Sequence, residues 1–595
     1  MGFGSGSSGS LKDLERAGSE EETEILSNPS LLSSGPGSSS VSTSPPSQVQ
    51  EDTYNFEKGA ARLYDESIFG ELRVKDCLSF LGPGFLITIA YVDPGNFEVD
   101  MQAGAQFGSS LLWVLLIATG AGLLVQILCI RLAVTTGRHL SQMCRHEYTP
   151  LQSKALWILS ELAIIASDIP EVIGTAFALK MLFGIPVTAG ILVTSTSAML
   201  FLLLQQLGAR VLEIFFAFLV GIISCCFVAE LSYVGDHVSA GDVFAGLFSF
   251  GYLKKPIATS AYIAVGMLGA LVMPHNLFLH SALVLARDKE TDPSRIEMRT
   301  IGEKQEFHRL NTSESGPSYD LGKGADKRKG KSGLPVDVKQ TKLVVFYGGL
   351  ESALALGFSL FINVAVVIVA HSTVEGVSEE EKQKLIDQPL QNAPTMLKNV
   401  LGTAAKTFFG CALLASGLSS TMTGTLAGQY VMEGFVDFNL KPALRAFITR
   451  SVAIVPSLLV TIVAGESGSE ELIVFSSVVL SFELPFALIP LVKFVCSKKL
   501  MGPMVVKGTE KWISLTISVV VILANVFMLG SFVVSAMGHG KMTAGDFLLL
   551  AFSLGGGAAY VWVLYKMLTK DVEQHLRTVN PTRFQELSKL SVGTS

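Results

Sequence analysis

The sequence contains Asp93-Pro94-Gly95-Asn96 and, 180 residues later, Met273-Pro274-His275-Asn276, each set in the middle of an otherwise apolar run. A run that long and that apolar is typical of a membrane span, and in hydrocarbon every backbone N–H and C=O group needs a partner within the protein. Proline and glycine at mid-span therefore predict a broken helix, which is tolerated only where the break lines a cavity or is buried in protein. Matching breaks in corresponding positions of two halves indicate the substrate site of a transporter built from inverted repeats.

Groups that bind metal ions meet at these two breaks. The carboxylate of Asp93, the amide of Asn96 and the freed backbone carbonyls are hard oxygen ligands, whereas the thioether of Met273 is a soft sulfur ligand. A thioether is of little use to Mg²⁺ or Ca²⁺ but is acceptable to Mn²⁺, Fe²⁺, Co²⁺ or Cd²⁺. The pattern predicts a transition-metal site near the bilayer midplane. The alternatives are that Asp93 only caps a broken helix and that Met273 only fills the core.

The composition indicates a polytopic membrane protein. Of the 595 residues 49% are hydrophobic and only 16% are charged, which is too apolar for a soluble chain of this size. The seven cysteines include no CxxC pair, so they are interpreted as packing residues and not as disulfides or zinc ligands. No nucleophile and base pair or phosphate-binding loop stands out. We therefore expect no enzyme activity, no resident cofactor and no nucleic-acid partner.

Apolar runs of about 20 residues, the length that crosses a hydrocarbon core, recur from Leu78 onward and number about twelve. The approximate spans are 78–103, 109–134, 155–183, 187–207, 211–233, 258–287, 343–370, 404–434, 444–464, 471–496, 512–535 and 545–567. Lys and Arg concentrate in the even-numbered linkers, so the positive-inside rule places both termini in the cytosol.

The segments outside the spans are polar. Residues 1–70 are rich in Gly, Ser, Pro and Glu and predict a disordered cytosolic tail, because they cannot bury enough apolar surface to offset the entropy of ordering. The transporter domain is predicted at 71–568, with a flexible cytosolic loop at 288–341, and a second cytosolic tail at 569–595.

The N-terminal tail contains Glu21-Glu22-Thr23-Glu24-Ile25-Leu26, which has the form of an acidic dileucine sorting signal. Glu21, Ile25 and Leu26 would be read by sorting adaptors, and the protein would then reside in a vacuolar, lysosomal or endosomal membrane. The alternatives are a chance match in a Glu-rich tail and residence in the plasma membrane.

A third segment, Gly428-Gln429-Tyr430-Val431-Met432-Glu433-Gly434, completes a resemblance to the Nramp family of proton-coupled divalent metal transporters. The resemblance extends from about Leu81 to Met567, and the first two motifs together are highly specific to that family. It implies an all-α membrane protein of the leucine-transporter type, with five plus five spans as inverted repeats, broken helices 1 and 6 and two added helices. It also implies symport of Mn²⁺ or Fe²⁺ with H⁺. We expect a monomer in the lipid bilayer.

The family pattern implies that Asp93, Asn96, Met273 and the backbone carbonyl of Ala270 bind the metal, and that a residue of span ten joins them when the site is occluded. This chain departs from the pattern in span ten. Ser477 stands where family members usually carry Gln or Asn, and Glu483 stands where they carry Gln. Ser477 is thus the candidate for the fifth ligand.

Proton coupling needs titratable groups apart from the metal ligands. Asp168 and Glu171 are three residues apart and therefore share one face of a helix. In the family the matching acidic pair forms the proton route, with partner arginines in span nine, here Arg445 and Arg450; a purely structural ion pair is the alternative. Further candidates are Glu98 and Asp100, which extend the acidic line from span one, and His275, which follows Met273 by two residues. His280 is expected to be a packed, hydrogen-bonded histidine.

Two other functions remain open. The first is a metal sensor or signalling scaffold on the same fold. Such a protein would carry a large soluble C-terminal domain, whereas here only about 28 residues follow the last predicted span. The second is a cation-coupled amino-acid symporter, which would need Gly-rich breaks lined by backbone and Ser or Thr ligands for sodium. The convergence of Asp, Asn and Met favours a secondary active transporter of divalent transition-metal ions toward the cytosol.

Overall fold

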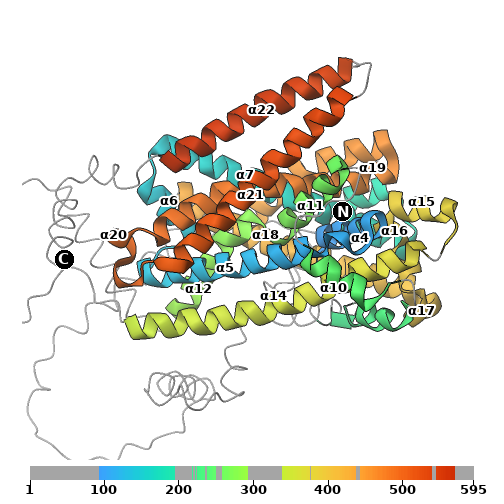
Figure 1. Cartoon of the computed structure of the whole chain (residues 1–595), viewed down its shortest axis with the longest axis horizontal. Helices are drawn as coiled ribbons and strands as arrows, with labels where there is room; N and C mark the ends of the chain where they lie inside the picture. The colour runs from blue at the N-terminus through green and yellow to red at the C-terminus, as the bar shows by residue number, and fades with distance from the viewer. Residues whose placement is uncertain are drawn as a thin grey trace, which may run out of the picture. The chain divides into compact units, whose positions relative to one another are not determined.

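The computed structural model describes residues 93–194, 218, 221–222, 224–234, 238–249, 257–291, 338–375, 377–436, 442–538 and 544–569. Among these residues the regular structure consists of α-helices and short 3₁₀ turns, without a strand (Figure 1). The longer α-helices are α4 (Pro94–Phe107), α5 (Leu112–Thr136), α6 (Leu140–Glu147), α7 (Pro150–Phe183), α10 (Ala240–Phe248), α11 (Ile257–Leu271), α12 (Pro274–Thr291), α14 (Val338–Glu375), α15 (Glu379–Asp387), α16 (Pro389–Met396), α18 (Ala405–Val436), α19 (Pro442–Val495), α21 (Gly508–Gly538) and α22 (Ala544–Thr569). The short elements include η2 (Gly108–Leu111), α17 (Lys398–Leu401), α20 (Lys498–Met501) and η7 (Gly502–Met504).

The prediction of an all-helical membrane protein is confirmed. By length and composition, seven segments among the described residues can cross a membrane: Pro94–Thr136, Pro150–Phe183, Ile257–Ala286, Thr341–Glu375, Lys398–Val436, Phe447–Val495 and Gly508–Ser531. Pro94–Thr136 covers the described part of the first predicted span together with the second, and Phe447–Val495 covers the ninth and the tenth. The helix α22 occupies the position of the twelfth.

Glycine ends several of these helices where the sequence needs a change of direction. The helix α5 ends at Thr136. The next residue, Gly137, adopts the left-handed conformation (φ 68°) and donates its N–H to the carbonyl of Ala133. Gly184 ends α7 in the same way, with φ 70° and an N–H bond to Lys180. A residue without Cβ takes this conformation without steric cost, and the bond satisfies one of the free carbonyls of the last turn.

The linker expected between the ninth and tenth spans is absent from the described structure. Instead α19 continues from one span into the next, and Gly465 alone (φ 72°, ψ −158°) introduces a kink. The predicted end of the ninth span at 464 is confirmed by this kink, whereas the predicted start of the tenth span at 471 is too late, because the helix resumes directly after Gly465. One glycine at positive φ redirects the chain without the loop that other residues would require.

The helices pack as an inverted repeat predicts. The helix α7 lies along both α18 and α19, and α5 lies along α14 and α12. Since α5 and α14 are the second and seventh predicted spans, and α7 and α18 the third and eighth, corresponding members of the two repeats are direct neighbours. The two broken spans are brought into the same neighbourhood, because α11 contacts both α4 and α19.

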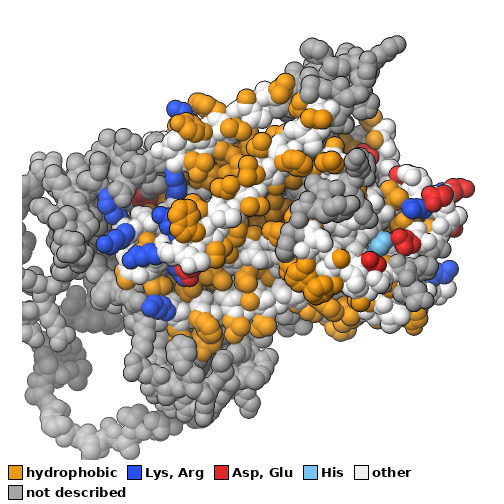
Figure 2. All heavy atoms as spheres, in the orientation of Figure 1, with side chains coloured by type: hydrophobic (Ala, Val, Ile, Leu, Met, Phe, Trp, Pro, Cys, Tyr) orange, Lys and Arg blue, Asp and Glu red, His pale blue; other side chains and the backbone are white. Residues whose placement is uncertain are grey.

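Charged side chains are separated along the spans. Figure 2 shows hydrophobic side chains over the middle of the visible face, mainly Lys and Arg at the end where α20 lies, and Asp and Glu together with some Lys at the end where α15 lies. The basic end includes Lys498 and Lys499 of α20, and the acidic end includes Glu379, Glu380 and Glu381 in the first turn of α15. An apolar belt between two polar ends is the surface expected of a chain that spans a bilayer.

Some predictions concern residues that the structure does not describe. The tail 1–70, with Glu21, Ile25 and Leu26, lies outside the described residues, as do residues 570–595 and most of the loop predicted at 288–341. At the edges of that loop α12 continues to Thr291 and α14 begins at Val338, so both helices are longer than the predicted spans.

The closest approach of α11 to α19 predicts the effect of adding one methyl group. A Cβ on Gly269 would overlap the backbone carbonyl of Ser477 and lie 2.6 Å from the backbone nitrogen of Ser481. Overpacking of this kind costs about 1–3 kcal/mol, so Gly269→Ala should lower the melting temperature of the purified protein. The control is Gly266→Ala, one turn earlier in α11, where the new Cβ would lie 3.5 Å from Val99 and would only add helix propensity. Equal melting temperatures for the two variants would contradict this packing.

Candidate metal site

The break between α11 and α12 follows from the position of one proline. In a continuous helix the carbonyl of Ala270 would accept a hydrogen bond from the backbone nitrogen of residue 274, but Pro274 has no N–H. The chain leaves the helical conformation at Val272 and Met273 and resumes it at Pro274, the first residue of α12. The carbonyl of Ala270 is thus released from the helix while it remains buried.

The start of α4 places a carboxylate at a helix N-terminus. Asp93 is the N-cap of α4, and its Oδ1 accepts a hydrogen bond of 2.7 Å from the backbone N–H of Asn96. Only 4% of Asp93 is exposed. The helix N-terminus stabilises the negative charge, and the carboxylate retains a second oxygen for a ligand.

The start of α4 meets the break between α11 and α12 directly. The side-chain nitrogen of Asn96 donates to the released carbonyl of Ala270, with the two atoms 3.4 Å apart. The helix α4 also packs closely on α7, because a Cβ on Gly174 would lie only 2.5 Å from the Cβ of Pro94, and a Cβ on Gly95 would lie 3.4 Å from Pro170. These glycines allow the backbone of α4 to approach α7 at the break itself.

Met273 brings the sulfur to this junction. It is 5% exposed, and its side chain lies in a small apolar cluster with Ala163 and Ala166 of α7 and Leu480 of α19. The Asn276 amide nitrogen donates to its Sδ over 3.5 Å. The structure therefore buries Asp93, Asn96, Ala270 and Met273 at the start of α4 and at the break between α11 and α12. A carboxylate, an amide, a carbonyl and a thioether suit a transition-metal ion. Among the described residues no group of three or more His, Cys, Asp or Glu side chains able to hold a metal occurs.

Ser477 is buried beside this junction, but its side chain is directed along its own helix. Its Oγ donates to the carbonyl of Ile473, 3.1 Å away, while its backbone carbonyl faces Gly269 of α11. In this conformation the hydroxyl is occupied by α19. For Ser477 to reach a metal ion, that hydrogen bond would have to break.

A second polar cluster lies between α7, α18 and α19. Arg450 is 1% exposed, and its Nη1 donates to Oε2 of Glu171 at 3.1 Å and to Oγ1 of Thr421 at 2.6 Å. The Thr421 hydroxyl also contacts the same Glu171 oxygen at 3.0 Å. Asp168 lies within the electrostatic reach of Arg450 and Arg445 and within hydrogen-bonding reach of Thr449. Both predicted carboxylates and both predicted arginines are thus assembled in one buried cluster.

The partner of Arg445 was missed by the sequence analysis. Its Nη2 donates to both oxygens of Glu161, at 2.7 and 2.6 Å, and Glu161 also accepts a 2.9 Å hydrogen bond from the indole of Trp157. The signal that could have found Glu161 is its spacing, because it precedes Asp168 by two helical turns on the face that also carries Glu171. The glycine at the start of the third motif has a role here, since a Cβ on Gly428 would lie 2.5 Å from the guanidinium of Arg445.

Glu98 has a different set of neighbours. It is completely buried, its Oε1 accepts a 2.7 Å hydrogen bond from Gln102, and its carboxyl lies within hydrogen-bonding reach of the Leu390 backbone and of Glu470. Glu470 itself accepts from the backbone N–H groups of Leu390 and Gln391, the second and third residues of α16. Glu98 therefore faces α16 and α19, and Glu470 is a further buried carboxyl that the sequence analysis did not identify.

The two histidines of α12 are both buried. His275 directly follows Pro274, and in the described part of the chain its Nδ1 has no hydrogen-bond partner, so this nitrogen is available for a proton or for a group that enters the site. His280 was expected to be hydrogen-bonded, and that expectation was wrong: neither ring nitrogen has a partner among the described residues. Its neighbours in the apolar core include Leu277 and Phe278 of the same helix.

Comparison with known proteins connects this geometry with a family. The model of the natural resistance-associated macrophage protein-like family, Nramp, matches residues 84–531. Among curated proteins, metal transporter Nramp1 of Populus trichocarpa is 42% identical over 503 residues, which cover 84% of each chain. Metal transporter Nramp5 of Oryza sativa subsp. japonica is 44% identical over 441 residues, which cover 74% of this chain and 73% of the relative.

Among solved structures, the manganese transporter of Eremococcus coleocola in complex with an aromatic bis-isothiourea substituted compound has a TM-score of 0.64 and 25% sequence identity. The match covers 84% of this chain and 95% of that transporter. A single-residue variant of the same transporter gives a TM-score of 0.65 with 97% of its chain covered. This likeness confirms the predicted leucine-transporter-type fold class.

The burial of Arg450 predicts a large effect on stability. Arg450→Ala would leave Glu171 buried without its cation, which costs about 3–5 kcal/mol for a buried pair. The control is Lys384→Ala, because Lys384 and its partner Glu380 have 69% and 85% exposed side chains and such a pair contributes no more than about 1 kcal/mol. Thermal unfolding of both variants in detergent measures the difference. Adding Glu171→Gln to Arg450→Ala should recover part of the loss, and similar melting temperatures for Arg450→Ala and Lys384→Ala would show that the Arg450 pair is not structural.

Proposed function

The chain belongs to the Nramp family, and from this premise we propose that it moves divalent transition-metal ions, Mn²⁺ or Fe²⁺ and also Cd²⁺ and Co²⁺, together with H⁺ toward the cytosol by alternating access. The observation that carries the proposal is the contact of Asn96 with the carbonyl of Ala270, which joins the two helix breaks where Asp93 and Met273 are buried. The named relatives are metal transporters, and the solved structures are of a manganese transporter.

The donor set explains which ions we propose as substrates. Asp93 supplies one formal negative charge, Asn96 and Ala270 supply neutral oxygens, and Met273 supplies the sulfur. An ion with a strong preference for oxygen loses a good ligand when a thioether replaces water, whereas a transition-metal ion keeps much of the bond. A single carboxylate also suits a transported ion, because a site with several carboxylates would hold the ion too tightly to release it.

The proton is proposed to follow the cluster on α7. Glu171 and Asp168 are buried beside Arg450, and neither belongs to the proposed metal ligands. Buried carboxylates in a membrane-spanning segment are costly, and where they occur they mark proton or ion pathways. His275 and Glu98 are proposed as further groups of this pathway, because both are buried in helices that begin at the two breaks.

The orientation is proposed from the charge distribution. The end of the spans that carries Lys498 and Lys499 would face the cytosol, and the end that carries α15 would face the lumen or the outside. Both termini would then be cytosolic, where adaptors can reach the sorting signal proposed at Glu21, Ile25 and Leu26.

The test of the proposed function is uptake of radioactive Mn²⁺ and Fe²⁺ into proteoliposomes, with and without a pH gradient that is acidic outside. We expect uptake of both ions, and faster uptake with the gradient. Asp93→Ala should abolish uptake and, in calorimetry, the binding of Mn²⁺, because it removes the only formal negative charge of the proposed ligands. The control is Asp100→Asn, which changes an acidic residue of α4 seven positions after Asp93 and should retain Mn²⁺ binding. Unchanged Mn²⁺ affinity of Asp93→Ala would refute the site.

Met273 generates the prediction on selectivity. Met273→Ala should keep appreciable Mn²⁺ transport, lose most Cd²⁺ affinity and become sensitive to millimolar Ca²⁺. A loss of only about 1.4 kcal/mol in selectivity changes the ratio of the two ion affinities tenfold. Met273→Leu keeps most of the side-chain volume without the sulfur, so it separates the thioether from the filling of the apolar cluster. The measurement is Mn²⁺ uptake in competition with Ca²⁺ and Cd²⁺. If Met273→Leu keeps the selectivity of the unmodified protein, the sulfur is not the selective group.

A further inference from the structure

A cavity of about 620 Å³ lies between α5, α14 and residues 503–505, apart from the metal and proton sites. Most of its wall is apolar, and side chains of both helices contribute, among them Leu123 and Ile127 of α5 and Val345 and Leu350 of α14. The charged residues of the wall are Arg131 and Lys342, and both are basic. A cavity of this size with an apolar interior and a few polar groups at one end has the properties of a ligand site.

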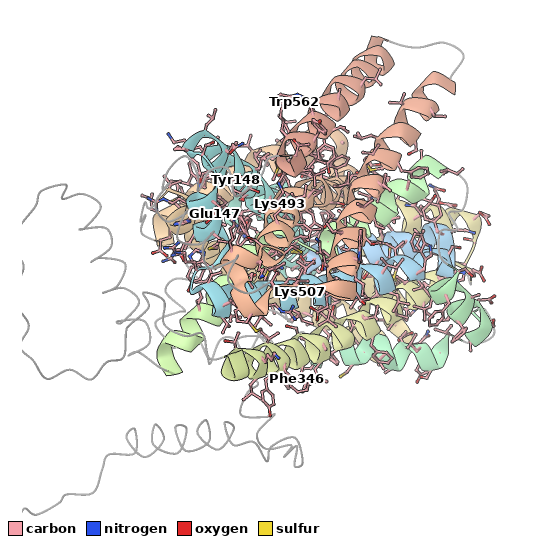
Figure 3. All side chains as sticks on the ribbon, turned by 60° about the vertical axis from the view of Figure 1, so that its left-hand side comes forward. Glu147, Tyr148, Phe346, Lys493, Lys507 and Trp562 are labelled. Atoms are coloured by element: carbon pink, nitrogen blue, oxygen red, sulfur yellow. The ribbon has the colours of Figure 1, made fainter. Side chains whose placement is uncertain are left out.

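The cavity is continuous with the lipid-facing side of α14. Phe346 lines the cavity and is 53% exposed, and Figure 3 shows its side chain projecting outward from α14. Leu354, Phe358 and Phe361 continue this exposed apolar surface along the same helix. A molecule in the cavity would therefore be in contact with the hydrocarbon of the bilayer, which favours a lipid over a water-soluble ligand.

The basic end of the cavity has an unsatisfied donor. Arg131 donates from Nη1 to Oε2 of Glu510 at 2.7 Å and from Nη2 to Oε1 at 3.3 Å. Its Nε is buried and has no hydrogen-bond partner among the described residues. A buried donor without an acceptor is unfavourable, so this N–H indicates that an oxygen atom of a bound ligand accepts its hydrogen bond.

The charge at this end is complementary to an anion. Glu510 neutralises the charge of Arg131, and Lys342, which is exposed in the first turns of α14, leaves one positive charge in excess. The phosphate of a phospholipid accepts hydrogen bonds from guanidinium and ammonium groups, and its acyl chain matches the apolar wall. Residues 503–505, which follow α20 closely, line the cavity together with Arg131 and Lys342, so both basic residues lie toward the end of the spans where Lys498 and Lys499 are found.

We propose that this cavity binds an anionic phospholipid, with its phosphate at Arg131 and Lys342 and one acyl chain between α5 and α14. Basic pockets between membrane helices on the cytosolic side hold anionic headgroups in this manner. The proposal does not depend on the proposed transport function, because lipid binding is measured on the purified chain without a metal ion or a pH gradient.

The test is native mass spectrometry of the full chain in detergent, titrated with phosphatidylglycerol or phosphatidylcholine. We expect tighter binding of phosphatidylglycerol. Lys342→Gln should weaken phosphatidylglycerol binding about fivefold, because one basic side chain strengthens the binding of an anionic lipid by about this factor. The same variant should leave phosphatidylcholine binding unchanged. Lys498→Gln removes the same charge at the same end of the molecule outside the cavity wall and should have no effect.

A second variant tests the acyl-chain part of the cavity. Ala353→Trp would place a large side chain in the apolar interior and should weaken binding of the anionic lipid. If Ala353→Trp does not fold, the comparison of Lys342→Gln with the unmodified chain still tests the proposal. Equal affinity for the two lipids, or an equal effect of Lys342→Gln and Lys498→Gln, would overturn the headgroup assignment. Displacement of the lipid by excess glycerol 3-phosphate would overturn the lipid itself and identify a site for a soluble anion.

Discussion

The fold depends on the requirement that backbone groups within hydrocarbon find hydrogen-bond partners inside the protein. Pro274 removes the donor that Ala270 would have in a continuous helix, and the side chain of Asn96 from the other broken span replaces it. The two halves of the molecule are thus joined by the bond that the break made necessary. At 3.4 Å this bond is long for an N–H···O contact, so an ion that coordinates the Ala270 carbonyl would replace a weak interaction.

The buried charges follow a second requirement, that each is compensated nearby. The helix α7 contributes the carboxylates of Glu161, Asp168 and Glu171, and α19 contributes the guanidinium groups of Arg445 and Arg450. Glu161 pairs with Arg445 and Glu171 pairs with Arg450, so Asp168 shares cations that are already engaged. Within this cluster there is one more acidic side chain than basic ones. In the proposed mechanism a proton supplies the missing positive charge, which is why the cluster suits a proton route better than a purely structural ion pair.

The residues at the breaks could be predicted from the sequence because proline, glycine and an intramembrane carboxylate each violate the rule for a continuous apolar helix. Contacts between helices could not be predicted in the same way. The partner of Arg445 depends on how α7 and α19 rotate about their axes, so Glu161 was missed although Arg445 itself was identified. The kink at Gly465 was taken for a loop, since a glycine within a polar interruption predicts either. For Ser477 the sequence indicates its position in span ten, but only the structure shows that its hydroxyl donates to Ile473.

The helix α7 connects the proposed metal and proton sites. Pro170 lies between Asp168 and Glu171 and packs against Gly95, so the carboxylates flank the residue that contacts the break of α4. Pro170 also deprives the carbonyl of Ala166 of its helical donor, and the Ala166 side chain packs in one cluster with Met273. A helix weakened at this position can bend more easily than a continuous one. In the proposed mechanism an ion bound between Asp93 and Met273 would press on α7 at the turn that carries the two acidic groups, and this contact would couple the two sites without any bond between metal and proton ligands.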